Sequence, residues 1–203
     1  MVALLAGERQ ADLLDAVRRQ LYLYEKCGGD VIQPDQVAGD SAVMKLHANP
    51  DLMIDAMLGM HLSFDDLETS DQERYMGLVK WANGSARVMS IDVPSGLDAS
   101  SGMISPACST SLAAADIVTQ GSATVLDRAD LLIPSDVVLS LGAPKTGLLT
   151  AMSKSDGFSR LEVLVADIGI GNQVWRKFGA RSKHGVAFGF EWVTRLRFQA
   201  GFE

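Results

Sequence analysis

The sequence contains no long apolar run and only two cysteines. A helix needs about 20 predominantly apolar residues to cross a bilayer, and no segment of the chain approaches that length. Residues 1–6 are too few to form the apolar core of a signal peptide. Cys27 and Cys108 lie far apart, with neither the spacing of a metal site nor the density of a disulfide framework. We therefore expect a soluble, intracellular protein with no membrane partner and with both thiols reduced.

Histidine and positive charge are also scarce. The three histidines, at positions 47, 61 and 184, are widely separated, so no local spacing supports a histidine metal site. Lysine and arginine number 18 against 25 acidic residues, a net charge of -7, and this balance gives the whole chain no attraction to nucleic acid. The 203 residues, 47% of them hydrophobic and 21% charged, are typical of one globular domain with a substantial core.

The chain is organised around residues 88–102, VMSIDVPSGLDASSG. Mostly apolar residues lead into Asp92 and a Pro-Ser-Gly turn, which predicts a buried strand that ends in a sharply folded polar loop. Ligands of open α/β sheets bind beyond the carboxyl ends of the strands, so Asp92 and Ser95 are candidates to line such a crevice. The same residue types are ordinary in turns, and Asp92 as a turn cap is an equal alternative.

Short apolar runs alternate with segments of helical periodicity along the whole chain. The expected strands are residues 2–5, 31–32, 52–58, 88–91, 137–141 and 161–168, and the expected helices are residues 11–25, 36–46, 70–83, 148–152 and 172–178. For residues 99–136 we expect irregular structure with one strand or short helix. This alternation predicts an α/β fold, a Rossmann-like three-layer αβα sandwich with a mostly parallel central sheet.

Three segments allow finer predictions. In the first helix, apolar residues at three- and four-residue steps should face the sheet; they include Leu14, Val17 and Leu21. In the third, Ser70 should be the N-cap and Glu73 the partner in a capping box. The expected inner-face residues of that helix are Met76, Val79 and Lys80. In the tail, we expect Trp192 and the phenylalanines to pack in the core or in a dimer, and Arg195 and Arg197 to share an exposed strand face.

Three strand ends carry residues that can do chemistry: Asp55, Asp92 with Ser95, and Lys145. We expect their loops to gather at one edge of the sheet. Asp55 interrupts an apolar run, so it must lie near the exposed end of its strand or be paired. These groups could hold a hydrated cation and a polar ligand, or exchange protons. The alternative is a set of capped turns with one Lys-Asp pair.

The strings IDVPSGLDASSG, LMIDAMLG, LGAPKTGLL and VLVADIGIG occur in the order and at the spacing of the YjeF N-terminal domain family, which the chain resembles over nearly its whole length. We therefore expect one such domain over residues 1–203, apparently truncated at its N-terminus, where the family's first helices are missing. The family contains potassium-dependent epimerases of hydrated NADH and NADPH. It also contains the C-terminal domain of the enhancer of mRNA decapping scaffold, which serves dimerisation and RNA or nucleotide binding.

The resemblance also implies roles for individual residues. Asp55 and Ser95 match the residues that contact potassium in the enzymes. Asp92 matches the aspartate that contacts the nicotinamide substrate, and is the candidate catalytic residue. The candidates for binding a nicotinamide or adenine nucleotide are Gly59, Ser63, Asp92 and Lys145.

Two features decide between the branches of the family. The enzymes carry a Gly-Asn-Asn-Gly-Gly-Asp-Gly type of turn after their first strand, whereas this chain has only Gly7 there, which argues against tight dinucleotide binding. The segment 181–199, RSKHGVAFGFEWVTRLRFQ, resembles the ending of fungal decapping enhancers. We therefore predict a non-catalytic homodimeric domain that binds decapping proteins and RNA or a nucleotide in cytoplasmic P-bodies, where mRNA decays. The alternative is a potassium-dependent NAD(P)HX epimerase.

Overall fold

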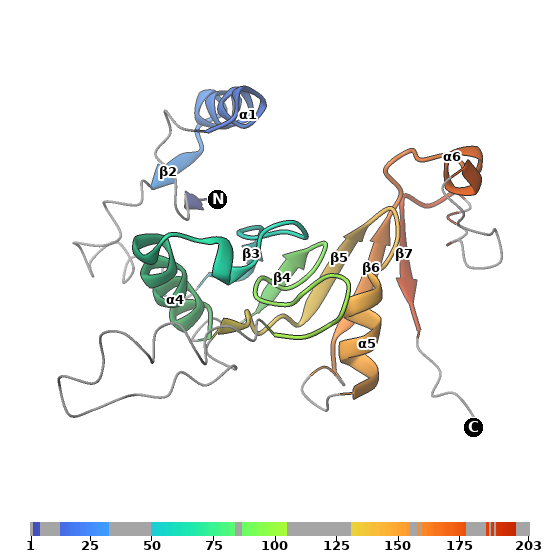
Figure 1. Ribbon diagram of the computed structural model, residues 1–203. Helices are drawn as coiled ribbons and strands as arrows, with labels where there is room; N and C mark the ends of the chain where they lie inside the picture. Colours follow the sequence, from blue (N-terminus) through green and yellow to red (C-terminus); the bar gives the residue numbers. More distant parts are fainter. Residues whose placement is uncertain are drawn as a thin grey trace, which may run out of the picture.

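A five-stranded sheet forms the central layer of the computed structural model (Figure 1). The structure describes residues 2–4, 13–32, 50–83, 87–104, 131–154, 158, 160–177, 186, 188 and 190–197. The sheet has the order β3 (Met53–Asp55), β4 (Val88–Ile91), β5 (Val137–Leu141), β6 (Glu162–Ala166) and β7 (Val193–Leu196). Neighbouring strands are parallel from β3 to β6, and β7 is antiparallel to β6. The predicted α/β fold with a mostly parallel sheet is confirmed.

One face of this sheet carries the buried side chains. Ser90 of β4 is in register with Val138 of β5, which is in register with Val163 of β6, and all three are fully buried. Helix α4 (Thr69–Asn83) covers the β4 end of that face and helix α5 (Thr146–Lys154) covers the β6 end. Both helices connect consecutive parallel strands, and right-handed crossovers in one direction place their helices on the same face.

A second, two-stranded sheet lies at the N-terminal end of the chain. Strands β1 (Val2–Leu4) and β2 (Asp30–Ile32) are parallel and are joined through helix α1 (Asp15–Lys26), so the βαβ unit is confirmed. The expected inner face of α1 is wrong at two positions, since Leu14 is 77% exposed and Val17 46% exposed, while Leu21 is buried. Leu14 is the N-cap, outside the helix. Leu14 and Val17 are therefore not covered by any element of the described part of the chain.

The start of α4 differs from the prediction. The helix begins at Thr69, so Ser70 lies inside it and does not form a capping box with Glu73. The capping box lies earlier, where Ser63 and Asp66 bond each other's backbone around the 3-10 helix η1 (Phe64–Asp66). Lys80 is exposed, so its inner-face assignment is also wrong. The buried residues of α4 are Tyr75, Leu78, Val79 and Ala82.

The remaining elements match the predicted segments closely. Helices α5 and α6 (Asn172–Lys177) confirm the expected helices at 148–152 and 172–178. The strand expected over 52–58 stops at Asp55, because Met57 N–H turns back to the Asp55 carboxylate. The expected helix at 36–46, residues 105–130 and Cys108 lie outside the described residues.

In the tail, Arg195 and Arg197 are exposed on one side of β7, as predicted. Phe190 and Trp192 are exposed rather than packed in the core, because the β7 edge of the sheet is not covered by any described element. Cys27 is a free, exposed thiol. None of the described helices is both long and apolar enough for a membrane span.

Candidate binding site at the carboxyl edge of the sheet

A buried polar cluster lies where β3 ends. Asp55 is 4% exposed and Ser95 is 1% exposed. Oδ1 of Asp55 accepts hydrogen bonds from Ser95 Oγ at 2.7 Å and from Met57 N at 3.3 Å. Oδ2 accepts hydrogen bonds from Ser95 N and from Ser90 Oγ, both at 2.8 Å. Burial of an unpaired carboxylate costs several kcal/mol, and these four donors offset that cost.

The same cluster connects four segments of the chain. Ser95 Oγ accepts a hydrogen bond from Leu58 N at 3.1 Å, which ties the turn after β4 to the loop after β3. Ser90 of β4 also bonds the hydroxyl of Ser135, just before β5. Both conditions expected for Asp55 are met, since it lies at the end of its strand and is paired.

The donors around Asp55 decide whether these residues fit a potassium ion. The two oxygens of a carboxylate together accept about four hydrogen bonds. The carboxylate of Asp55 already accepts four, from protein donors. Ser95 Oγ also accepts a hydrogen bond from Leu58 N, which occupies one of its two lone pairs. A cation would have to displace these donors, so the described residues do not fit a potassium site. Across the described part of the chain, no group of three or more His, Cys, Asp or Glu side chains could hold a metal ion.

Asp92 and Lys145 form a second polar group, beyond the ends of β4 and β5. Lys145 Nζ lies 2.7 Å from Asp92 Oδ1, and their side chains are 18% and 16% exposed. Nζ also donates to the carbonyls of Leu141 and Ala143, both at 3.3 Å, so its three hydrogens have acceptors. Leu141 N donates to the same Asp92 oxygen at 2.9 Å. The pair therefore fastens the β4 turn to the start of α5.

The backbone of Asp92 is in the left-handed region, with φ of +73°. A residue other than glycine rarely adopts this conformation, which costs on the order of 1–3 kcal/mol. Asp92 N donates to Leu139 O at 2.9 Å, and Ser140 Oγ donates to Asp92 O at 3.3 Å. These bonds and Lys145 hold the strained residue in place. Strain of this kind is concentrated at ligand and active sites.

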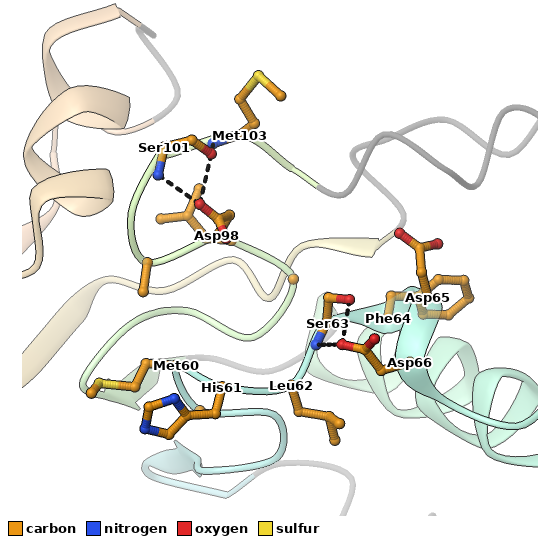
Figure 2. Close-up of a pocket in the computed structure, with 14 residues that line it drawn as sticks. Met60, His61, Leu62, Ser63, Phe64, Asp65, Asp66, Asp98, Ser101 and Met103 are labelled. Carbon is orange, nitrogen blue, oxygen red and sulfur yellow. Dashed lines mark hydrogen bonds between the residues drawn. The ribbon is translucent and has the colours of Figure 1, made fainter.

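A pocket of about 480 Å³ opens between two loops next to the Asp55 cluster. One wall is residues 59–66 and the other is residues 96–103 (Figure 2). The second wall needs glycine at position 96, where φ is +94° and a Cβ atom would lie 2.0 Å from Leu131 O. The lining residues include Gly59 and Ser63, two of the six candidate site residues. Asp55, Ser95, Asp92 and Lys145 do not line it.

Two carboxylates of the pocket are held by serines. Ser101 donates to Asp98 Oδ1 from Oγ at 2.7 Å and from N at 2.6 Å, and these bonds lower the pKa of Asp98. The backbone and the hydroxyl of Ser63 donate to Asp66 Oδ2 at 2.8 and 2.7 Å, and they lower the pKa of Asp66. Figure 2 shows both groups on facing sides of the pocket. Both carboxylates are therefore charged at neutral pH.

The pocket is acidic and partly apolar. Asp65, Asp66 and Asp98 line it, and no lysine or arginine is among its described lining residues. Its exposed apolar side chains are Met60, Leu62 and Met103, which are 44%, 43% and 55% exposed. Asp98 and the second wall were not among the site residues predicted from the sequence. A signal was present in the string SGLDASSG, where Asp98 is followed two and three residues later by Ser100 and Ser101. An aspartate just ahead of serines and glycine is typical of a turn in which the side chain bonds the backbone.

A sequence model of the family described as "YjeF-related protein N-terminus" matches residues 1–147. The chain belongs to this family. The match covers both loops that form the pocket, the Asp55 cluster and Lys145.

Two relatives of known function are similar to the chain, and they differ in activity. The "Enhancer of mRNA-decapping protein 3" of Saccharomyces cerevisiae is 30% identical over 169 residues, which are 78% of this chain and 30% of that protein. The "NAD(P)H-hydrate epimerase" of Dehalogenimonas lykanthroporepellens is 28% identical over 177 residues, 87% of this chain and 54% of that protein. The chain therefore spans about a third to a half of the length of these relatives.

A solved structure shows the same fold. The crystal structure of yeast ynu0, YNL200c, superposes with a TM-score of 0.62 at 17% sequence identity. The superposition covers 96% of this chain and 65% of that chain. At this identity the likeness supports the fold and says nothing of the activity.

Proposed function

We propose that this chain is a non-catalytic dimerisation and binding domain that acts with decapping proteins in cytoplasmic mRNA decay, including assembly of P-bodies. The similarity to a decapping enhancer supports this role. The proposed ligands of the domain are decapping proteins, a second copy of the chain and RNA.

The hydrogen bonding of Asp55 is the observation that carries this proposal. The resemblance to the epimerases assigns the oxygens of Asp55 and Ser95 to a potassium ion. In this chain the Asp55 carboxylate has four protein donors, and one of them is the Ser95 hydroxyl. These oxygens stabilise the connection between β3 and β4, which supports a role in the fold instead of in cation binding.

The charge of the pocket supports the same conclusion. A dinucleotide brings two or more phosphate charges, and the pocket presents Asp65, Asp66 and Asp98 without a lysine or arginine among its described lining residues. Like charges in a partly enclosed site repel. We therefore expect NAD and adenine nucleotides to bind the loop at Gly59 and Ser63 weakly. RNA binding by a chain of net charge -7 should be weak and should fall steeply with salt.

Light scattering tests the dimerisation, and calorimetry tests the ligands. At tens of micromolar protein we expect the mass of a dimer, and strictly monomeric behaviour would contradict the proposal. Titration with hydrated NADH, NAD and ATP should give no heat beyond dilution at the same protein concentration. Binding that requires potassium would instead support an intact nucleotide site.

The strained Asp92 supports one alternative, a potassium-dependent NAD(P)HX epimerase. Asp92 is held in a left-handed conformation by Lys145 and Leu141, as an aligned catalytic group would be. In that case Asp92 contacts the substrate or exchanges its proton. The variant Asp92→Asn would then lose turnover and keep its fold, as judged by circular dichroism. A rate equal to that of the wild-type chain would exclude Asp92 from the reaction.

A further inference from the structure

Strand β7 has a free edge with a defined set of backbone groups. Trp192 O accepts a hydrogen bond from Asp167 N at 2.8 Å, on the side of β6. Backbone groups alternate in direction along an antiparallel strand, so those of residues 192, 194 and 196 point toward β6. Within β7 the groups that point away belong to Val193 and Arg195, whereas Glu191 N, just before the strand, donates to Phe188 O at 3.0 Å. Among the described residues, no strand pairs with this outer side (Figure 1).

The same edge carries large apolar side chains. Phe190 and Trp192 are fully or largely exposed, at 107% and 77%, and Val193 is 40% exposed. Residues 190–197 contain neither lysine nor proline, the residues that most often protect a strand edge from pairing. An exposed edge of this composition is suited to pair with another strand.

We propose that β7 pairs in antiparallel orientation with β7 of a second copy of this chain, around a two-fold axis at Thr194. This inference rests on the proposed dimerisation and names its surface. The two sheets would then join into one continuous sheet through the outward backbone groups. An isologous contact of this kind closes after two copies, which is the symmetry of most dimers.

Charge complementarity sets this register. An axis at Thr194 places Glu191 opposite Arg197 of the second copy. By symmetry, Arg197 of the first copy lies opposite Glu191 of the second. Val193 and Arg195 then face each other as the hydrogen-bonded pairs, in agreement with the outward direction of their backbone groups. An axis at Arg195 would instead place two arginines directly opposite each other, which is destabilising. An axis at Val193 would direct Glu191 to Arg195, which already bonds Glu162 of β6 at 3.0 Å.

Apolar packing agrees with the same register. With the axis at Thr194, Trp192 lies opposite Leu196 of the second copy. Leu196 is partly buried and packs against the core cluster that contains Val138, Leu148 and Val163. The indole would therefore cover the open end of that core in the other copy. Aromatic residues paired across strands with aliphatic ones stabilise antiparallel sheets.

Sedimentation velocity on the full chain tests this surface. In the variant Arg197→Glu, the new glutamate lies opposite Glu191 of the other copy, at both ends of the contact. The repulsion should raise the dimer dissociation constant about tenfold. Glu191→Arg should weaken the dimer to a similar degree. The double variant Glu191→Arg with Arg197→Glu should restore the dissociation constant to within about twofold of the wild-type value. Lys80→Glu, an exposed change on α4 with the same loss of charge as Arg197→Glu, is the matched control and should have no effect.

A second variant keeps the test valid if a charge reversal perturbs the fold. Val193→Pro removes an N–H that points away from β6, so the β6 pairing is retained while the outer pairing is blocked. It should give a monomer with an unchanged circular dichroism spectrum. A dimer unaffected by all of these variants would overturn the β7 surface and leave the proposed dimerisation intact. A monomeric wild-type chain would overturn both.

Discussion

Ser95 donates a hydrogen bond from Oγ to Oδ1 of Asp55 at 2.7 Å, across 40 positions of the sequence. The resemblance to the epimerases assigns both residues to potassium, and here each satisfies the other. Because Ser95 Oγ also accepts from Leu58 N, this contact positions the loop that begins the pocket wall at Gly59. The polar residues at the edge of the sheet thus shape the pocket without entering it.

Loss of the Ser95 hydroxyl should destabilise the fold. Ser95→Ala leaves a lone pair of Asp55 and the N–H of Leu58 without their partner in a buried site, at a cost of about 1–3 kcal/mol in the free energy of unfolding. Urea denaturation measures this loss. Ser153→Ala removes an exposed hydroxyl on α5 and should change stability by less than about 0.5 kcal/mol. Equal effects of the two variants would contradict a structural role for Ser95.

Gly96→Ala should be strongly destabilising. The φ of +94° disfavours any side chain, and the new Cβ would lie 2.0 Å from Leu131 O, a backbone atom that cannot move alone. We expect a loss of at least about 2 kcal/mol and a disrupted pocket wall. The control is Gly77→Ala, in the exposed middle of α4 with no atom near the new Cβ, which should gain about 0.5–1 kcal/mol. A tolerated Gly96→Ala, as judged by thermal unfolding, would be inconsistent with this packing.

The strands and the mostly parallel sheet could be predicted from the sequence, but the pocket could not. The mostly apolar runs at 88–91 and 137–141 predict buried strands, and both are strands. The start of the helix was predicted wrongly, because Ser63 and Ser70 are each followed three residues later by an acidic residue. The sequence pattern of a capping box is therefore the same at both serines, and only Ser63 forms one. The pocket depends on Gly96 passing close to Leu131, a contact between distant segments that no local pattern encodes.

The candidate site residues show the same limit. Spacing alone predicted that Asp55, Ser95, Asp92 and Lys145 lie at strand ends, and they do. It could not tell whether the oxygens of Asp55 and Ser95 share a cation or bond each other, because both arrangements need the same residues. The number of donors at the Asp55 carboxylate decides this, and Ser90 and Ser95 supply three of them from a segment far from Asp55 in the sequence.

Acid should loosen the second pocket wall. The pKa of Asp98 is lowered by its bonds from Ser101 and Ser100, so the folded state favours the ionised form. Its contribution is complete above the ordinary Asp pKa of about 3.9 and is lost as the pH falls through the lower folded value. The protection factor of the Ser101 amide against hydrogen exchange, relative to the intrinsic rate at each pH, should fall in this acidic range. Asp98→Asn should show a low protection factor at all pH values, and wild-type protection in that variant would refute the role of the charge.

Alkali should destabilise the fold through Tyr75. Its buried hydroxyl donates to Leu131 O at 2.7 Å, and burial, with the charge of Asp55, raises the pKa of Tyr75 far above its usual value. The stability from the neutral phenol is complete below the unfolded pKa of about 10 and declines as the pH rises above it. The free energy of unfolding in urea should therefore fall as the pH rises above about 10. Tyr75→Phe should show a smaller fall; an equal fall would assign the alkali sensitivity elsewhere.

Turnover of hydrated NADH tests most directly the proposal that this member of the family is not an epimerase. The assay follows the interconversion of the two epimers by the folded chain, once in potassium and once in sodium buffer, with Asp92→Asn as the comparison. The account predicts a rate equal to the uncatalysed rate in both buffers for both proteins. A potassium-dependent rate that Asp92→Asn abolishes would contradict it.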